Sequence, residues 1–334
     1  MDAAPPAIDH ARAGEVTSRP SSTRSNRTVR ELAANGSVVA RLTVDRMHIS
    51  LGQGAWVAMD AVGNVATEPA HRRRGYARQL MLATIEAMRA GGAAISMLYG
   101  IDDFYDRLGW VRAGDEQWLQ LPVDGHDFDC STASGATPAG WHDRAATADD
   151  LPAMRALYAE WARDAVGAAM RGNDDVAWAV VHAPNAARVL VDASGAVAAY
   201  AVSAGSLHVA QERASMFPGD TVLGELHARD DQSAAAALEM ARTWAEALRP
   251  ARADGAMRYV HVGCGPQSLL ERAANAFEHR VDRHVRPRGG SMVLLLDSGR
   301  WHDSWGGEPR DWTSELVGAT LLTAGQYLCV VDRY

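Results

Sequence analysis

The stretch from residue 65 to residue 80, VATEPAHRRRGYARQL, combines residue types that can hold an anionic group. The unpaired N–H groups and the dipole at the start of a helix favour a bound phosphate. Gly75 lets phosphates approach the backbone, and the small Ala77 keeps the first helical turn open. Four arginines surround this turn: Arg72, Arg73, Arg74 and Arg78. The pattern predicts a pyrophosphate cradle, with an ordinary strand–helix connection that carries a basic surface turn as the alternative.

Composition limits what the rest of the chain can do. The 334 residues carry a formal net charge of -8, and the length suggests two domains. All 33 basic residues are arginine, which excludes lysine Schiff bases and lysine general bases. The acidity argues against a nucleic-acid partner. Three distant cysteines predict a reducing, cytoplasmic location, and the absence of a long apolar run predicts no membrane span.

Hydrophobic spacing indicates which elements position the basic turn. Alternating and β-branched runs over residues 37–67 predict successive antiparallel strands. Residues 75–88 have helical spacing, and the glycines that follow end this helix. Residues 93–100 read as a short buried strand, and residues 102–109 as a short helix capped by Asp102. The run WLQLPV, which begins at residue 118, is expected to be the last strand of this unit.

A second cycle of elements follows a polar, aperiodic segment. It contains a long amphipathic helix after Thr147, a hairpin, the strand TVLGELHA, a helix, the strand YVHVG, another helix and a last strand, SMVLLLD. This order repeats that of the first half. We therefore expect a loose N-terminal arm (1–28), a first domain (29–122), a linker (123–140), a second domain (141–298) and a C-terminal tail (299–334).

Two motifs in order carry a family resemblance. The pattern VATxPxxRxxGYA at residues 65–77, followed by LYGIxxFYxxxGW at residues 98–110, resembles motifs A and B of the GNAT superfamily of N-acetyltransferases. The resemblance covers residues 37–122. It implies an α+β fold of two tandem GNAT-like domains, each a mixed, mostly antiparallel sheet flanked by helices. It also implies acetyl-CoA as cosubstrate and direct acyl transfer without an acyl-enzyme.

The resemblance also implies roles for individual residues. The strand Val65, Ala66 and Thr67 would pair with the pantetheine arm and aim a backbone N–H at the thioester carbonyl. Backbone N–H groups from Arg73 through Gly75 and Tyr76 to Ala77 would hold the pyrophosphate. Tyr105 occupies the motif position of a tyrosine that protonates the CoA thiolate. The alternative is that Tyr105 is a core aromatic residue paired with Leu108, but its neighbour Phe104 can supply that packing.

The acceptor amine must lose a proton, and several side chains are candidates for the groups around it. Asp60 precedes the cofactor strand and Glu68 follows it; each is a candidate general base or a solvated strand-end carboxylate. Asn64 is a candidate for orienting the acceptor. His71 is interpreted as a surface or phosphate-edge residue. The histidines lack ligand spacing, so we predict no metal.

In the second half the phosphate turn does not recur. Residues 229–234, RDDQSA, follow the equivalent strand, contain no glycine and place Asp230 and Asp231 where phosphates would bind. Carboxylates oppose phosphates electrostatically. We therefore expect a degenerate GNAT-like domain without its own cofactor, whose acidic residues lie near a cationic acceptor or on an ordinary solvated surface.

The tandem outline is similar to two groups, the Eis-like aminoglycoside acetyltransferases and the lysine N6-acetyltransferases of yeasts. In the first group a C-terminal carboxylate acts as base, which makes Tyr334 a candidate, although we expect no third domain after residue 298. The predicted function is N-acetylation of a primary amine on a small cationic or amino-acid-like molecule. A non-catalytic sensor of acyl-CoA or amine is the alternative, and another acyl group or a protein N-terminus is a third possibility. We expect neither nucleic-acid nor membrane partners, and the oligomeric state stays open.

Overall fold

The computed structural model describes two units, each of which we treat separately. The described residues are 14–22, 25–100, 103–113, 116–123, 137–173, 176–203, 217–248, 257–263, 268–276, 282–286, 291–306, 311, 313–314 and 316–317. Unit 1 comprises residues 1–49, 56–113 and 291–319, and unit 2 comprises residues 50–55, 114–290 and 320–334.

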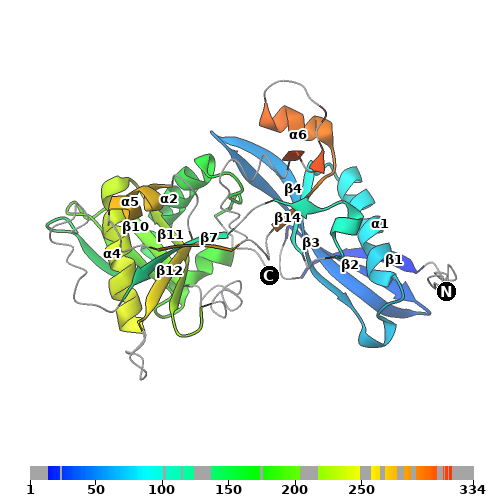
Figure 1. Cartoon of the computed structure of the whole chain (residues 1–334), viewed down its shortest axis with the longest axis horizontal. Coiled ribbons are helices and arrows are strands. Elements are labelled where there is room, and N and C mark those ends of the chain that lie inside the picture. The colour runs from blue at the N-terminus through cyan, green and yellow to red at the C-terminus, as the bar shows by residue number, and fades with distance from the viewer. Residues whose placement is uncertain are drawn as a thin grey trace, which may run out of the picture. The chain divides into compact units, whose positions relative to one another are not determined.

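Unit 1 is built on a seven-stranded sheet of order β1-β2-β3-β4-β5-β14-β6 (Figure 1). Its strands are β1 (Glu15–Pro20), β2 (Arg27–Ala34), β3 (Ser37–Gly52), β4 (Ala55–Thr67), β5 (Ile95–Tyr99), β6 (Val111–Arg112) and β14 (Ser291–Leu295). Its helices are α1 (Tyr76–Ala90), α6 (Ser298–Trp305) and the 3-10 turns η1 (Pro69–His71) and η2 (Asp106–Leu108). The pair β4–β5 is parallel, whereas β1–β2, β2–β3, β5–β14 and β14–β6 are antiparallel.

Helix α1 forms as its apolar spacing predicts. Leu80, Met81, Ile85 and Met88 share one face and are buried in the core of unit 1. Each such buried side chain contributes about 1.5–3 kcal/mol. The helix ends at Gly91, and the next residue, Gly92, has a φ of +84°. The apolar face fixes α1 on the sheet, so its N-terminal end is held just after β4.

Unit 2 has a second seven-stranded sheet, of order β13-β7-β12-β11-β10-β9-β8. Its strands are β7 (Glu116–Pro122), β8 (His142–Ala145), β9 (Ala187–Val191), β10 (Val197–Ser203), β11 (Thr221–Ala228), β12 (Tyr259–Gly263) and β13 (Asp282–Arg286). Its helices are α2 (Leu151–Asp164), α4 (Asp231–Leu248), α5 (Leu269–Ala276) and the 3-10 turns η3 (Ala148–Asp150) and η4 (Val176–His182). A capping box between Thr147 and Asp150 starts η3, just before α2.

The two halves of the sequence exchange one strand. The sequence predicts WLQLPV as the last strand of the first unit, but β7 pairs with β12 and β13 in unit 2. Conversely, SMVLLLD is expected to close the second domain, but β14 pairs with β5 and β6 in unit 1. Both strands have the same apolar character, so no local signal distinguishes their partners. With this exchange, the order β4-β5-β14-β6 in unit 1 matches β11-β12-β7-β13 in unit 2.

The predicted terminal segments also contain structure. Within the expected loose arm, β1 forms an edge strand paired with β2, and its polar side chains are exposed. Within the expected tail, α6 buries Trp301 completely. A polar edge strand and a short capped helix carry too little hydrophobic periodicity to be recognised from sequence. The capping role expected for Asp102 lies outside the described residues; η2 begins after Tyr105.

A charged cluster is buried inside unit 2. The Glu225 carboxylate accepts from Tyr200 Oη at 2.8 Å and lies 2.8 Å from Arg171 Nη2. The Arg171 guanidinium stacks 4.0 Å from the ring centroid of Tyr158. His227 is 5% exposed, and its ring nitrogens lack hydrogen-bond partners within the described residues. Burial lowers the pKa of His227 from 6.5 to about 4, although Glu225 opposes this shift.

This cluster predicts acid sensitivity of unit 2. The folded state keeps His227 neutral, whereas the unfolded state binds a proton at this residue below pH 6.5. The contribution of His227 to the free energy of unfolding is therefore complete above pH 6.5 and is lost as the pH falls towards 4. The full effect corresponds to about 3 kcal/mol. Denaturant unfolding followed between pH 7 and pH 4 should show this loss, and a His227→Phe variant should show a weaker pH dependence. Equal pH slopes for the two proteins would contradict the prediction.

Candidate functional site

The edge between β4 and β5 opens part of the way along the two strands. The described parallel pairing ends at Ala61 and Met97, although β4 continues to Thr67 and β5 to Tyr99. Asn64 has a left-handed φ of 54°, which breaks the pleat of β4 in the manner of a β-bulge. Its Nδ2 donates to Thr43 Oγ1 at 3.3 Å, which ties the bulge to β3. Residues 65–67 therefore extend beyond the described pairing with β5.

The turn after β4 leads directly to an uncapped helix start. Gly75, at φ 82°, is the N-cap residue of α1, and no side chain caps the helix. A Cβ atom at Gly75 would meet nothing within 4 Å, so the space above the helix start is open. The first N–H groups of a helix have no intrahelical acceptor. Together, these features leave the N–H groups of the first turn available to an external anion.

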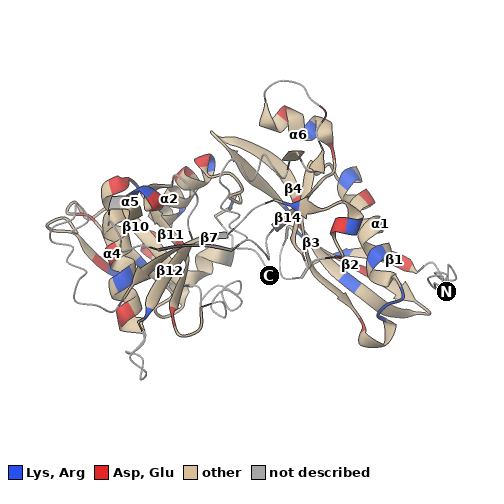
Figure 2. Ribbon diagram, in the orientation of Figure 1, with Lys and Arg blue, Asp and Glu red and all other residues tan. Residues whose placement is uncertain are grey.

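The arginines of this turn carry unneutralised charge. Arg72, Arg73, Arg74 and Arg78 are exposed, and none has a carboxylate partner among the described residues. Arg72 Nε donates to the Thr67 carbonyl at 3.3 Å, which orients one of them. Elsewhere in each unit, basic and acidic residues are interspersed (Figure 2). The positive charge at the α1 start is thus a local feature, as an anion site requires.

His71 and Tyr76 flank the same turn. Their rings meet edge to face, with 6.1 Å between centroids. Tyr76 also packs against the core of unit 1, as does Val65. These contacts fix the turn between β4 and α1, and they leave His71 as a packing neighbour at the edge of the arginine cluster.

Tyr105 lies beside the C-terminal end of β5. A Cβ atom added to Gly100 would lie 3.2 Å from Tyr105 Cδ2. Because the parallel register pairs Ala61 with Met97, Gly100 is level with the opened part of β4. Tyr105 is 8% exposed, and its ring packs edge to face on Phe104 at 4.9 Å. The residue therefore takes part in core packing and also lies next to the opened strand edge.

Sequence reasoning missed one wall of this region. Met292, on β14, lies so close to Gly100 that a Cβ atom there would fall 2.1 Å from its sulfur. A side chain at position 100 would therefore displace the side chain of Met292, which belongs to a strand from the far end of the sequence. The only available signal was a glycine at a strand end, which indicates no particular partner.

Asp60 is held in an ion pair. Its two carboxylate oxygens accept from Arg46 Nε and Nη2, each at 2.8 Å, and the residue is 2% exposed. Its backbone carbonyl accepts from Ser96 Oγ at 2.9 Å, where β4 and β5 are still paired. A carboxylate that is buried and bound on both oxygens is suited to holding strands together more than to taking a proton from an acceptor.

An Asp60→Asn substitution should accordingly lower the stability of the protein more than its acetyl-transfer rate. We expect a destabilisation of about 2 kcal/mol, because the change leaves Arg46 without its carboxylate. We expect less than a tenfold fall in the acetyl-transfer rate per folded molecule. Asp45→Asn is the control, since Asp45 also forms a bidentate pair with an arginine, Arg27, although that arginine is buried whereas Arg46 is partly exposed. A hundredfold loss of rate in Asp60→Asn alone would identify Asp60 as the base instead.

The remaining predicted residues divide into exposed and undescribed positions. Glu68 is exposed, and its N–H donates to the Val39 carbonyl at 2.9 Å. Asn64 is exposed next to the opened strand edge. Tyr334 lies outside the described residues. Of the two base candidates near β4, Glu68 is thus the one with a solvent-accessible carboxylate.

The equivalent helix start in unit 2 is closed by its own side chains. Asp230 Oδ1 accepts from Ser233 N at 2.7 Å, and Ser233 Oγ accepts from Asp230 N at 2.9 Å. Arg229 forms ion pairs with two carboxylates, Asp192 Oδ2 at 3.2 Å and Asp230 Oδ2 at 3.3 Å. A carboxylate therefore occupies the place that Gly75 leaves open in unit 1.

Within the described residues, no group of three or more His, Cys, Asp or Glu side chains could hold a metal ion. Among the helices of the described part of the chain, none is both long and apolar enough to cross a membrane.

Comparisons with known proteins agree with this geometry. Residues 13–113 match the family model described as an acetyltransferase (GNAT) domain. No curated protein matches the sequence. The resemblance that the two motifs carry is therefore confirmed over this part of the chain.

Solved structures share the fold over both units. A GCN5-related N-acetyltransferase from Kribbella flavida matches with a TM-score of 0.60 and 22% identity, over 84% of this chain and 64% of that one. A probable N-acyltransferase from Enterococcus faecalis V583 matches with a TM-score of 0.61 and 11% identity, over 88% of this chain and 75% of that one. Eis1 from Mycobacterium abscessus matches with a TM-score of 0.52 and 15% identity, over 80% of this chain and 64% of that one. This chain thus spans less than two thirds of the Kribbella and Mycobacterium proteins. The predicted α+β fold with two GNAT-like units is confirmed.

Proposed function

We propose that this protein is an acetyl-CoA-dependent N-acetyltransferase that acts on a primary amine of a small cationic or amino-acid-like molecule. The proposal rests on the uncapped start of α1, directly after the opened edge of β4, and on its four arginines, none of which has a carboxylate partner among the described residues. An anion-binding helix start next to free strand edges suits a ligand with a pyrophosphate and an amide-bearing arm.

Each part of the site then has a role. Backbone N–H groups from Arg73 to Ala77 bind the pyrophosphate, and the edge of Val65, Ala66 and Thr67 pairs with the pantetheine amides. Acetyl-CoA supplies the acetyl group as an activated thioester. A backbone N–H of this strand polarises the thioester carbonyl.

The reaction needs two proton transfers, and two further side chains have roles in them. Tyr105, beside the end of β5, donates a proton to the departing thiolate. Exposed Glu68, directly or through water, accepts the proton of the amine. Asn64, exposed at the bulge, orients the acceptor. Unit 2 binds no acetyl-CoA of its own because Asp230 fills its helix start.

The experiment that tests this proposal is a CoA-release assay with a panel of amines. The panel should include polyamines, aminoglycosides, amino acids and a peptide with a free N-terminus. We expect saturable CoA release with at least one small cationic or amino-acid-like amine. Tight acetyl-CoA binding without release by any amine would instead support the sensor function, and release with the peptide alone would overturn the acceptor class.

A further inference from the structure

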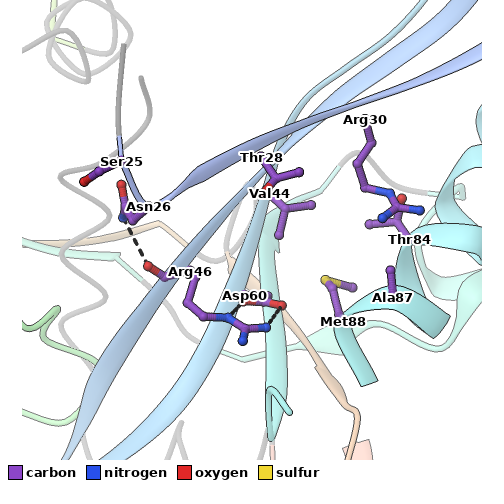
Figure 3. A pocket seen from close by; sticks show the side chains of 10 residues that line it. All are labelled: Ser25, Asn26, Thr28, Arg30, Val44, Arg46, Asp60, Thr84, Ala87 and Met88. Atoms are coloured by element: carbon purple, nitrogen blue, oxygen red, sulfur yellow. Dashed lines mark hydrogen bonds and ion pairs between the residues drawn. The ribbon is translucent and has the colours of Figure 1, made fainter. Parts of the chain in front are cut away.

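A cavity of about 450 Å³ lies in unit 1, away from the helix start described above. It is open to solvent on one side and is lined by residues 25–26, β2, β3, β4 and the second half of α1, where Thr84, Ala87 and Met88 form one wall (Figure 3). Thr84 and Met88 lie eight and twelve residues beyond Tyr76, which places this wall about 12–18 Å along α1 from its N-terminal end. The volume is within the range of small-molecule pockets.

The charges that line the cavity do not balance. Arg46 and Asp60 neutralise each other through their two hydrogen bonds (Figure 3). Arg30 reaches from β2 towards α1, and its Nη2 donates to the Ala83 carbonyl at 3.3 Å. Its Nε is buried without a hydrogen-bond partner, and Arg30 has no carboxylate partner among the described residues. The cavity therefore holds one uncompensated positive charge.

The environment of Arg30 disfavours that charge. Burial lowers the pKa of Arg30, and no neighbouring acid opposes the shift. A desolvated cation of this kind gains from any anion that enters the cavity. The nearby Thr84 hydroxyl is neutral and cannot balance this charge, and its Oγ1 already donates to the Leu80 carbonyl at 2.7 Å.

The other walls are suited to an apolar body. Val44 and Met88 also line the cavity, and both belong to the hydrophobic core of unit 1. A cationic ligand would be repelled by Arg30, because both oxygens of Asp60 are already bound to Arg46. A ligand of this cavity thus needs one negative charge and a short apolar part.

We propose that this cavity is a second ligand site, which binds a small organic carboxylate: its carboxylate pairs with Arg30 and its apolar part packs on Val44 and Met88. The site is separate from the acyl-CoA site and does not depend on the proposed function.

Benzoate and its uncharged counterpart benzamide test the site in the full-length protein. Titration followed by the side-chain Nε–H resonances of arginine should show saturable binding of benzoate at one site, with a shift of the Arg30 signal. Benzamide should bind at least tenfold more weakly. Saturating acetyl-CoA should leave the benzoate affinity unchanged; displacement by acetyl-CoA would place the anion at the helix start and overturn the proposal.

Variants separate a specific site from general charge attraction. Arg30→Gln should weaken benzoate binding at least tenfold, whereas Arg41→Gln, on exposed Arg41 of β3, should not change it. Ala87→Leu fills the cavity and keeps Arg30, so it should weaken binding as well and serves if Arg30→Gln does not fold. Absence of saturable binding to the wild-type protein, or equal affinity in Arg30→Gln, would overturn the proposal regardless of whether the protein transfers acetyl groups.

Discussion

Replacing Gly75 with Asp should weaken acetyl-CoA binding by about 100-fold or more, which corresponds to about 2.7 kcal/mol. The new carboxylate would lie at the start of α1, where we place the pyrophosphate. It would cap the free N–H groups and repel the phosphates, since unit charges about 5 Å apart interact by about 3 kcal/mol near a protein surface. Unit 2 already shows this arrangement, in which Asp230 caps the start of α4. Titration calorimetry with acetyl-CoA measures the effect.

Gly75→Asn is the matched control for this substitution. Asparagine has nearly the same size, tolerates the left-handed φ of 82° about as well, and also caps a helix, but it carries no charge. We expect Gly75→Asn to lose clearly less affinity than Gly75→Asp, and both variants to melt within a few degrees of the wild type. Equal losses in the two variants would show that the effect comes from backbone strain or from capping of the N–H groups, and not from charge repulsion of an anion.

Tyr105→Phe should lower kcat by about 100-fold or more and leave the KM for acetyl-CoA within a factor of three. A positioned proton donor contributes 10²–10⁴-fold to such a step. The substitution removes only the hydroxyl, so the edge-to-face contacts of the ring with Phe104 and Trp110 are retained. Steady-state CoA release with the best amine from the panel measures both constants.

Two controls accompany this variant. Tyr259→Phe removes a hydroxyl from a half-buried tyrosine of unit 2 and should leave kcat unchanged. The melting temperature of Tyr105→Phe should also stay close to that of the wild type. A kcat that is unaffected by Tyr105→Phe would assign this residue to packing alone and leave the thiolate to be protonated by water.

The part of the site that could be predicted from sequence is the part made by neighbouring residues. The strand, turn and helix of residues 65–80 lie in one continuous segment, so their spacing alone predicts an anion-binding helix start. The loss of the phosphate turn in the second half could be predicted for the same reason. The six residues 229–234 contain no glycine and carry the carboxylate of Asp230 at the corresponding place.

Features made by distant residues could not be predicted in this way. β14 completes the sheet of unit 1 from beyond residue 290, and its Met292 sets the space beside Gly100. The ion pair of Asp60 depends on Arg46, which lies on another strand; the carboxylate alone looked equally suited to act as a base. The bulge at Asn64 is likewise invisible in the sequence, since its φ of 54° depends on the surrounding sheet. Local patterns thus predict the open helix start, whereas the surroundings of the side chains near it depend on tertiary contacts.

Hydrogen exchange can locate acetyl-CoA at the start of α1 and along the opened edge of β4, where we propose that it binds. Amide exchange should be followed by mass spectrometry with and without saturating acetyl-CoA. We expect slower exchange at residues 65–67 and 73–78, and unchanged exchange at residues 229–235 of unit 2. Protection at residues 229–235 in place of residues 73–78, at a concentration where calorimetry shows saturation, would contradict this placement.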